Sequence, residues 1–418
     1  MKRYSEYKDS GVKWIGEIPG HWNAVSLKRV VKLINEKSNE QNIPYIALEN
    51  IESFTGKILP LNEIEPDSIC NKFKKDDVLF CKLRPYLTKC VSPSFDGKCT
   101  SELLVLRNFN GVANYLKYTL LSPRLVMDIN ASTYGAKMPR ANWNYIGLCR
   151  VPLPPLPEQE AIVTYLDTKV AKIDEYISIA EKKIAALEEL KQTIIAEAVT
   201  RGIHKDVPMK DSGVKWIGMI PEHWTVCKMR KSIYEINIKN NPIKTTQILS
   251  LTNKQGVIPY EDKGNQGNKA KEDISSYKIA FKDNIIMNSM NVIIGSVGLS
   301  NYEGCVSPVY YVYGIREGTD KHFINYICQL SFFQKELRRF AKGILEIRLR
   351  VSSKDIQNTY IALPSLSEQQ EIVTYIEAKV ASINQLCQAE RAQIEKLKEY
   401  KQRLISDVVT GKVKVTND

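Results

Sequence analysis

The sequence of 418 residues lacks the features that mark several large classes of protein. No apolar run approaches the roughly 18 residues that span a bilayer, and the first residues have no apolar core of the kind found in secretion signals. The nine cysteines include no CxxC pair, and an odd count without a framework is typical of reduced thiols. We therefore expect a cytoplasmic protein that neither crosses nor binds a membrane.

The motifs of the common catalytic and cofactor sites are also missing. The four histidines are too scattered to form a zinc cluster, so no metal site is predicted. There is no GxGxxG turn and no Walker A lysine. The nearest match to the Asn-Pro-Pro-aromatic loop of adenine methyltransferases, Asn241-Pro242-Ile243, lacks the second proline and the aromatic residue. We expect no catalytic residue and no cofactor bound by this chain.

Two His-Trp pairs could be mistaken for a site. His21 precedes Trp22, and His223 precedes Trp224. Histidines this far apart in the sequence, each beside an aromatic residue of the buried type, are more often packing residues than ligands. We interpret both pairs as parts of the core.

The sequence is a tandem repeat of one unit. Residues 8–22 (KDSGVKWIGEIPGHW) and 210–224 (KDSGVKWIGMIPEHW) share 13 of 15 residues, and residues 153–173 match 363–383 at an offset of 210. The stretches between these matched segments differ in length by eight residues and show little similarity. A duplicated frame with diverged inserts suggests that the frame serves assembly and the inserts serve specificity.

Each repeat ends in a segment with helical periodicity. Apolar residues recur every three or four positions over Glu158–Thr200 and Glu368–Thr410, with no internal glycine or proline. Ser367 and Gln370 predict a capping box at the start of the second helix. Matched seams of this length favour a coiled coil over two helices in separate globular domains. Two glycines end the predicted helices, Gly202 and Gly411.

The positive charge lies outside these helices. The whole chain has a net charge of +12, whereas the two predicted helices sum to −4 and −1, so the remainder carries +17. The inserts contain short β-branched and aromatic runs such as Val78–Phe80 and Val306–Tyr313, with helical stretches at Tyr115–Met127 and Phe323–Phe340. We therefore predict mostly β inserts with some helices and a surface that suits DNA, because phosphate neutralisation supplies most non-specific affinity.

Basic, amide and aromatic residues alternate in parts of both inserts. Arginine can fork onto guanine and asparagine onto adenine, whereas lysine mostly contacts phosphate. The competing interpretation of every one of these residues is ordinary solvated surface. The predicted DNA-binding residues of the first insert are Lys82, Arg84, Lys89, Lys137, Arg140 and Asn142. Those of the second are Lys263, Asn265, Gln266, Asn268, Lys269 and Lys271 in a polar loop, and Arg348 and Arg350, which we place on one face of a strand.

Several motifs together resemble the specificity subunit of type I restriction-modification systems. They are the duplicated WIGxIPxHW openings, the two LPxLxEQxxIVxYL helix starts, the KLRPYL segment, and residues 288–308. The resemblance covers essentially the whole chain. It implies an α+β protein with two pseudo-symmetric target-recognition domains, residues 1–155 and 209–365, separated by two long antiparallel coiled-coil helical spacers, residues 156–208 and 366–418.

The resemblance also implies partners and a role. A chain of this family reads a bipartite, asymmetric site on double-stranded DNA, while two methyltransferase subunits and the restriction subunits supply adenine methylation and cleavage. S-adenosylmethionine, ATP and magnesium are then expected in those partners. We expect apolar residues on the outward faces of the helices, Val163, Tyr165, Val373 and Tyr375, to bind the methyltransferase subunits. The alternative is a coiled-coil scaffold whose end domains bind proteins or other ligands, which leaves the +17 charge unexplained.

Overall fold

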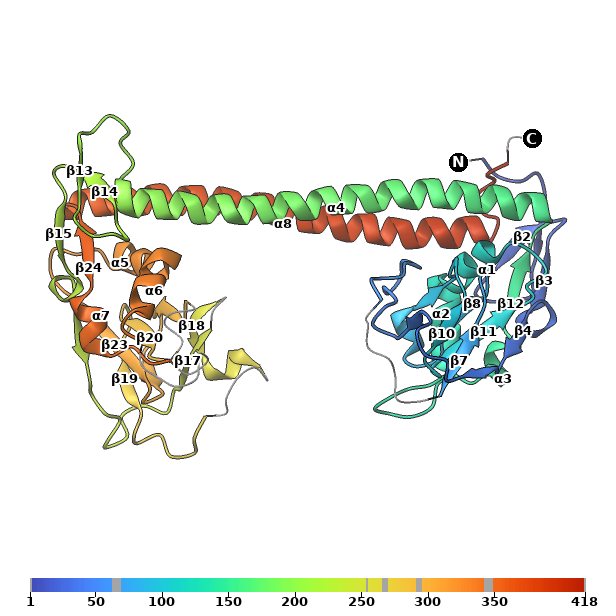
Figure 1. Ribbon diagram of the computed structural model, residues 1–418, viewed down its shortest axis with the longest axis horizontal. Helices are drawn as coiled ribbons and strands as arrows, with labels where there is room; N and C mark the ends of the chain where they lie inside the picture. The colour runs from blue at the N-terminus through green and yellow to red at the C-terminus, as the bar shows by residue number, and fades with distance from the viewer. Residues whose placement is uncertain are drawn as a thin grey trace. The chain divides into compact units, whose positions relative to one another are not determined.

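The chain folds into two compact units that share two long helices. The computed structural model describes residues 2–61, 69–252, 255–264, 270–290, 295–341 and 349–416. Unit 1 comprises Met1–Glu181 with Glu390–Asp418, and unit 2 comprises Lys182–Ala389. Both boundaries fall inside the helices α4 (Leu156–Arg201) and α8 (Leu366–Val409), so each unit contains a part of both (Figure 1).

The two long helices confirm the prediction from apolar periodicity, but the predicted cap of the second one is wrong. α8 begins at Leu366, and the side chain of Ser365 accepts a hydrogen bond of 3.3 Å from the backbone N–H of Glu368. Ser367 therefore lies inside the first turn and not at its cap. Pro157 occupies the matching position in α4, where a missing N–H has no cost.

Glycine ends both helices, as the sequence predicts. Gly202 follows α4 with φ +77°, and Gly411 follows α8 with φ +73°, values that favour glycine over any residue with a Cβ. A Cβ on Gly411 would lie only 2.4 Å from the Cδ of Pro19. This close approach lets the end of α8 pack onto the N-terminal segment of unit 1.

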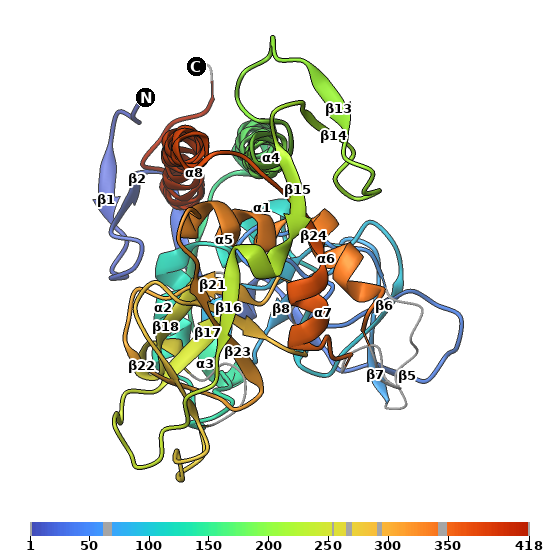
Figure 2. The same cartoon turned by 90° about the vertical axis from the view of Figure 1, so that its left-hand side faces the viewer.

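In each unit the helices run antiparallel along a buried apolar seam, and Figures 1 and 2 show them side by side. The start of α4 packs on the end of α8 in unit 1, and the end of α4 packs on the start of α8 in unit 2. Burying one such aliphatic side chain contributes roughly 1.5–3 kcal/mol. The seam of unit 1 includes Ile162, Leu166, Val170, Leu404 and Val408, and that of unit 2 includes Ile195, Ala198, Val199, Ile372 and Ile376.

The remaining elements of unit 1 precede α4 in the chain. Its strands are β1 (Tyr7–Asp9), β2 (Glu17–Pro19), β3 (Asn23–Ser26), β4 (Lys32–Ile34), β5 (Lys37–Ser38), β6 (Tyr45–Ile46), β7 (Cys70–Phe73), β8 (Val78–Cys81), β9 (Cys90–Val91), β10 (Gly97–Cys99), β11 (Leu103–Arg107) and β12 (Arg150–Leu153). Its short helices are α1 (Ala113–Leu120), α2 (Pro123–Ala131) and α3 (Trp143–Ile146), with 3₁₀ turns at Leu27–Arg29 and Pro85–Leu87.

The elements of unit 2 between the long helices follow a similar order. Its strands are β13 (Met209–Asp211), β14 (Met219–Pro221), β15 (Thr225–Lys228), β16 (Ile233–Ile236), β17 (Leu249–Thr252), β18 (Gly256–Pro259), β19 (Lys278–Ala280), β20 (Ile285–Asn288), β21 (Val297–Leu299), β22 (Gly304–Val306), β23 (Tyr310–Ile315) and β24 (Tyr360–Leu363). Its short helices are α5 (Lys321–Gln329), α6 (Ser331–Arg338) and α7 (Ser353–Asn358), with 3₁₀ turns at Met229–Lys231 and Tyr260–Lys263.

Each insert contains its own four-stranded sheet, and the two sheets have equivalent strand orders despite the different sequences. In unit 1 four strands pair in the order β4-β11-β8-β9, and in unit 2 four strands pair in the equivalent order β16-β23-β20-β21. Each unit also pairs the strand before its long helix with the strand after its opening motif, β12 with β3 and β24 with β15. The predicted α+β architecture with duplicated units is confirmed.

Local breaks divide three of the predicted runs. The predicted helix over 115–127 is two helices, because Pro123 begins α2 and cannot continue α1. The helix over 323–340 is likewise split, since Leu330 has extended backbone between α5 and α6. The apolar run 306–313 contains the end of β22 and the start of β23.

Candidate nucleic-acid interface

Two segments that the sequence separates by about fifty residues meet at the end of the unit 1 sheet. The first, which we call hairpin loop 1 (residues 82–89), connects β8 to β9. The second, bridging segment 1 (residues 134–142), follows α2 and leads into α3. Together they contain all six predicted DNA-binding residues of the first insert.

Backbone hydrogen bonds join these two segments. Leu83 and Arg140 form an antiparallel β-bridge, and the backbone N–H of Arg84 donates to the carbonyl of Pro139 over 2.7 Å. The guanidinium of Arg84 also reaches the carbonyl of Lys137, at 3.4 Å. The structure therefore brings the two basic segments of the sequence into one surface.

Hairpin loop 1 has an unusual backbone. Arg84 (φ +48°) and Thr88 (φ +49°) both adopt left-handed conformations, which cost a residue with a Cβ about 1 kcal/mol or more. The strain persists because Thr88 is buried and its carbonyl accepts a hydrogen bond of 3.1 Å from the N–H of Phe54. The result is a fixed loop that leaves the side chain of Tyr86 exposed at its tip.

The exposed side chains of this surface suit a nucleic acid. Lys137 is exposed, and it lies in the sequence between two large side chains that are also exposed, Tyr134 (60%) and Met138 (50%). Lys82 is half-buried in the loop beside Arg84. Aromatic faces beside cationic groups are the usual components of surfaces that contact bases and phosphates.

Three of the predicted residues have structural tasks of their own. Lys89 donates a hydrogen bond of 2.5 Å to the carbonyl of Leu48, which directs its ammonium inward. The side chain of Asn142 caps α3 by accepting from the N–H of Asn144 over 2.9 Å. Arg140 forms an ion pair with Glu102, with Nη2 2.9 Å from Oε1, and its hydrogen bonds to that carboxylate raise the pKa of the guanidinium. Their role in DNA binding stays a prediction.

In unit 2 the connection between β20 and β21 corresponds to hairpin loop 1. This connection, hairpin loop 2, spans residues 289–296 and has the same eight-residue length as hairpin loop 1. Gly295 has φ +87° one residue before the last, at the position where hairpin loop 1 has Thr88. This equivalence was not predictable from the sequence, since glycine and threonine look unrelated until their backbone angles are known.

The predicted residues of unit 2 are only partly described. Asn265, Gln266, Asn268, Lys269 and Arg348 lie outside the described residues. Lys263 places its ammonium 4.5 Å from the ring centroid of Tyr260, and the side chain of Lys271 is exposed. Arg350 is also exposed, and its Nη2 lies 3.8 Å from the sulfur of Met290.

The predicted outward orientation of two helix residues is wrong. Val163 and Val373 are buried in the cores of their units, because they lie next to the seam positions Ile162 and Ile372 and contribute to the same apolar face. The two tyrosines differ from them. Tyr165 is half-buried against the core of unit 1, whereas Tyr375 remains exposed.

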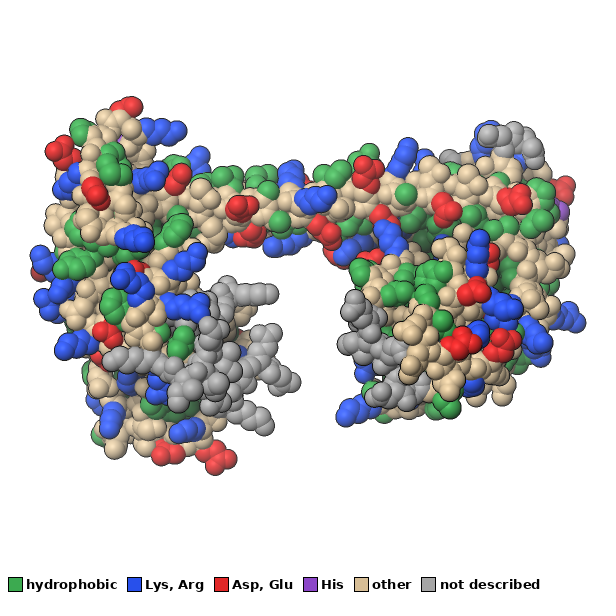
Figure 3. Space-filling model, in the orientation of Figure 1, with side chains coloured by type: hydrophobic (Ala, Val, Ile, Leu, Met, Phe, Trp, Pro, Cys, Tyr) green, Lys and Arg blue, Asp and Glu red, His purple; other side chains and the backbone are tan. Residues whose placement is uncertain are grey.

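Other exposed apolar residues on the helices escaped the sequence analysis. Four of them form two pairs at the repeat offset of 210, and each is 45 to 62% exposed. Each unit carries one from α4 and one from α8, and Figure 3 shows hydrophobic side chains at the surface of these helices. The offset applied to apolar residues away from the seam would have found them. They are Tyr176 and Tyr400 in unit 1, and Leu386 and Leu190 in unit 2.

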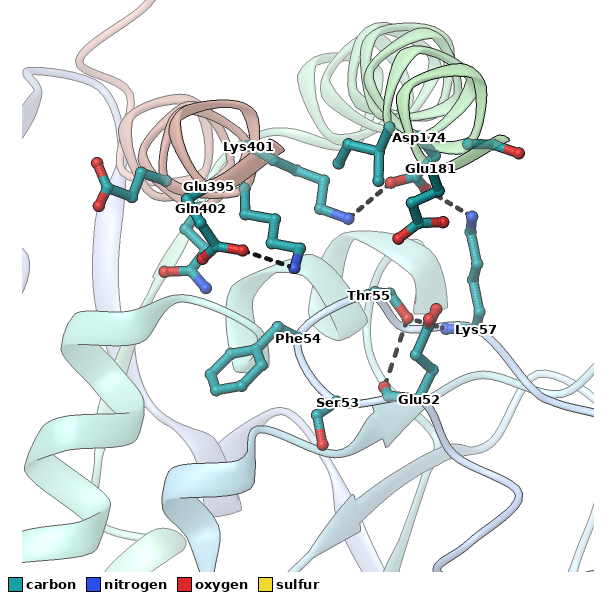
Figure 4. A pocket seen from close by; sticks show the side chains of 14 residues that line it. Glu52, Ser53, Phe54, Thr55, Lys57, Asp174, Glu181, Glu395, Lys401 and Gln402 are labelled. Carbon is teal, nitrogen blue, oxygen red and sulfur yellow. Dashed lines mark hydrogen bonds and ion pairs between the residues drawn. The ribbon is translucent and has the colours of Figure 1, made fainter. Parts of the chain in front are cut away.

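A network of charges ties an insert loop of unit 1 to the long helices. Asp174 of α4 accepts a hydrogen bond from Lys401 of α8 and forms an ion pair with Lys57 of the loop, each at 2.7 Å (Figure 4). Burial raises the pKa of Asp174, but the interactions with both lysines outweigh this effect and hold that pKa below its ordinary value. The network borders a cavity of about 590 Å³ next to Phe54. It fixes where the insert sits on the helices of its own unit.

The tryptophans of the His-Trp pairs are core residues, as predicted, but the prediction is wrong for His21 and His223, which are exposed and contact the carboxylates of Glu158 and Glu368. Trp22 is fully buried and donates to Glu158 over 3.1 Å, while His21 contacts the other oxygen of that carboxylate. Trp224 donates to Glu368 over 2.9 Å in the same way. Each opening motif thus holds the first turn of the long helix in its own unit.

Comparison with known proteins finds similarity to one family. Residues 221–396 match the type I restriction modification DNA specificity domain. The chain is 25% identical to the putative type I restriction enzyme MjaX specificity subunit of Methanocaldococcus jannaschii, in an alignment that covers 98% of each protein. The resemblance predicted from the duplicated motifs is confirmed.

Solved structures show the same fold. A chain from a structure that concerns complex assembly and conformational transition of the type I R-M system aligns with a TM-score of 0.69, 18% identity, and coverage of 94% of this chain and 98% of that one. The HsdS subunit from Thermoanaerobacter tengcongensis aligns with a TM-score of 0.53, 20% identity, and coverage of 95% and 98%. Residues 221–396, which match the DNA specificity domain, include hairpin loop 2 and Arg350.

Two negative findings hold for the described residues. Within them, no helix is long and apolar enough to cross a membrane. The same residues bring together no group of three or more His, Cys, Asp or Glu side chains that could hold a metal ion.

Proposed function

We propose that this chain is the non-catalytic subunit that reads a bipartite, asymmetric site on double-stranded DNA for a type I restriction-modification complex in the cytoplasm. In this proposal unit 1 reads one half of the site and unit 2 reads the other. The observation that supports it best is that both units have a sheet of the same strand order, with hairpin loops of equal length and different sequence. An equivalent framework with different loop chemistry suits two different half-sites, because base contacts specify sequence while the framework sets position.

The proposal assigns the chemistry to partners. Two methyltransferase subunits would methylate adenine with S-adenosylmethionine, and restriction subunits would cleave with ATP and magnesium. The equivalent exposed apolar residues support two matching docking surfaces, one on the helical part of each unit. Tyr176 and Tyr400 would contact the partner in unit 1, and Leu190 and Leu386 would do so in unit 2. Tyr375 is exposed on α8 of unit 2 and would add to the second surface.

The test maps methylated adenines in cells that express the methyltransferase with and without this chain. We expect one bipartite motif with unlike halves, which is lost when the chain is absent. Methylation that does not depend on the chain would contradict the proposal. So would methyl transfer by the purified chain alone, given S-adenosylmethionine and duplex DNA.

The stoichiometry offers a second measurement. Tyr176→Asp with Tyr400→Asp should remove one of two methyltransferase subunits in mass photometry, because a carboxylate disfavours an apolar interface. Leu190→Asp with Leu386→Asp should remove the other one. Gln192→Asp, an exposed polar position on α4, is the matched control and should leave both bound.

A further inference from the structure

Arg140 of unit 1 and Arg350 of unit 2 occupy the same place in the two frames. In unit 1 the residue after Arg140, Ala141, donates its N–H to the carbonyl of Lys82 in hairpin loop 1, over 2.9 Å. In unit 2 the residue after Arg350, Val351, donates its N–H to the carbonyl of Ser289 in hairpin loop 2, over 3.2 Å. Both arginines therefore lie beside the hairpin loop of their unit.

A second pair of hydrogen bonds identifies the neighbours of these arginines. The N–H of Lys82 donates to the carbonyl of Glu102 over 3.0 Å, and the N–H of Ser289 donates to the carbonyl of Val309 over 3.3 Å. Glu102 and Val309 are thus equivalent positions. The carboxylate that pairs with the arginine in unit 1 is replaced by an aliphatic side chain in unit 2.

The geometry of the pair in unit 1 leaves part of the guanidinium free. Nε of Arg140 lies 3.2 Å from both carboxylate oxygens of Glu102, and Nη2 lies 2.9 Å from Oε1. A guanidinium carries five N–H groups in a rigid fork. Glu102 occupies the edge formed by Nε and Nη2, so the two N–H groups of Nη1 and one of Nη2 remain for another acceptor pair.

Those remaining donors match guanine. The major-groove edge of guanine presents N7 and O6, and a bidentate arginine contact to them is the commonest specific contact with DNA. The arginine is 36% exposed and its carboxylate 21%, so the fork reaches the surface while its other edge is fixed. The charge argues against phosphate as the main target, because a guanidinium already neutralised by Glu102 offers a phosphate little net attraction.

We propose that Arg140 reads a guanine in the half-site of unit 1 and that Glu102 is its positioning residue, while Arg350, with Val309 at the position of Glu102, reads a guanine in the other half-site. This inference rests on the proposed function. Arg350 has no carboxylate partner among the described residues of unit 2, and it contacts Met290 through Nη2. The Arg140–Glu102 pair is neutral, whereas among the described residues the charge of Arg350 is not offset by an ion pair.

The experiment enriches bound sequences from a randomised library of duplex DNA, using the full-length chain together with any methyltransferase subunit that it binds. The main variant combines Arg140→Gln with Glu102→Gln, which removes the fork but keeps the net charge. We expect a roughly ten- to hundred-fold loss of preference at one G·C pair, confined to one half-site. Arg350→Gln should cause a comparable loss confined to the other half-site.

A conservative variant separates base reading from charge. Arg140→Lys keeps the charge but not the fork, so the guanine preference should stay lost. If the lysine restores that preference, or if the double glutamine variant loses no preference at any G·C pair, the inference is wrong. It is also wrong if the Arg140 and Arg350 variants affect the same half-site.

Single changes at the neighbouring position test the role of Glu102. Glu102→Gln should weaken the guanine preference of unit 1 about ten-fold or less and steepen the salt dependence of non-specific binding, because one cation is released. Val309→Glu should make the salt dependence shallower through the opposite change in unit 2. Unchanged discrimination in Glu102→Gln would remove the positioning role.

The wild-type chain distinguishes the two proposals. If it enriches no bipartite sequence, the proposed function itself fails. If it enriches such a sequence and the arginine variants enrich the same one, only the inference about Arg140 and Arg350 fails.

Discussion

Unit 1 has a carboxylate at two places where unit 2 has none. On the helices, Asp174 pairs with Lys401 at 2.7 Å, whereas in unit 2 the equivalent Lys191 donates a hydrogen bond of 3.4 Å to the uncharged amide oxygen of Asn384. Beside the hairpin loops, Glu102 of unit 1 corresponds to Val309 of unit 2. The cationic partner remains at all of these places.

The duplicated fold therefore does not depend on these ion pairs. Both units form the same four-stranded sheet and the same helix anchor, with or without the carboxylates. We expect Asp174 instead to affect the stability of unit 1, and Glu102 to lower the net positive charge beside hairpin loop 1. Apolar seams determine the frame, because they lose contact with water in both units alike.

The largest expected effect comes from breaking the helix network of unit 1. Asp174→Asn should destabilise unit 1 by about 3 kcal/mol, since it leaves Lys401, which is only 5% exposed, without its counter-charge. Hydrogen exchange measured by mass spectrometry should rise in the seam of unit 1. Asn384→Ala is the matched control in unit 2 and should change little there.

The same network should give unit 1 an acid-sensitive component. The pKa of Asp174 is held below its ordinary value in the folded chain, so its contribution is complete above the unfolded pKa of about 4 and is lost as the pH falls through the folded pKa. The stability difference between wild type and Asp174→Asn should therefore shrink below about pH 4. A difference that stays constant down to pH 2 would contradict this account.

An intermediate effect should be equal in both units. Gln159 is buried, accepts from the N–H of Val112 and donates to the carbonyl of Pro154. Replacing it by Leu leaves both backbone groups unpaired, which costs about 2 kcal/mol.

Gln369 is the matched residue of unit 2. It accepts from the N–H of Asp320 and donates to the carbonyl of Pro364. Gln369→Leu should raise hydrogen exchange at the start of α8 as much as Gln159→Leu raises it at the start of α4. An effect in one unit alone would show that the two anchors are not energetically equivalent.

The smallest effect should come from giving unit 2 the missing carboxylate. Asn384→Asp would create an ion pair with Lys191, but position 384 is exposed and Lys191 already contacts Glu188. Such exposed pairs contribute about 0.5 kcal/mol and weaken with salt. Thermal unfolding at low and high salt should show a slight gain that disappears at high salt. A gain comparable to the loss in Asp174→Asn would mean that burial does not control these pairs.

Repetition and periodicity in the sequence determined the frame. The matched openings, the apolar seams of α4 and α8, and the glycines that end them were all predictable, because local spacing and backbone freedom decide them. The cap at Ser365 was not predictable. Both Ser365 and Ser367 lie near the start of α8, and only the geometry of its first turn decides which of them caps it.

The tertiary structure alone decided which residues meet at the candidate interface. Hairpin loop 1 and bridging segment 1 are joined by hydrogen bonds between backbone groups, which leave no pattern in the side-chain sequence. The equivalence of Arg140 with Arg350, and of Glu102 with Val309, likewise appears only through those hydrogen bonds. The sequence specifies the repeated frame because apolar spacing encodes it directly, whereas pairing between distant segments depends on the folded chain.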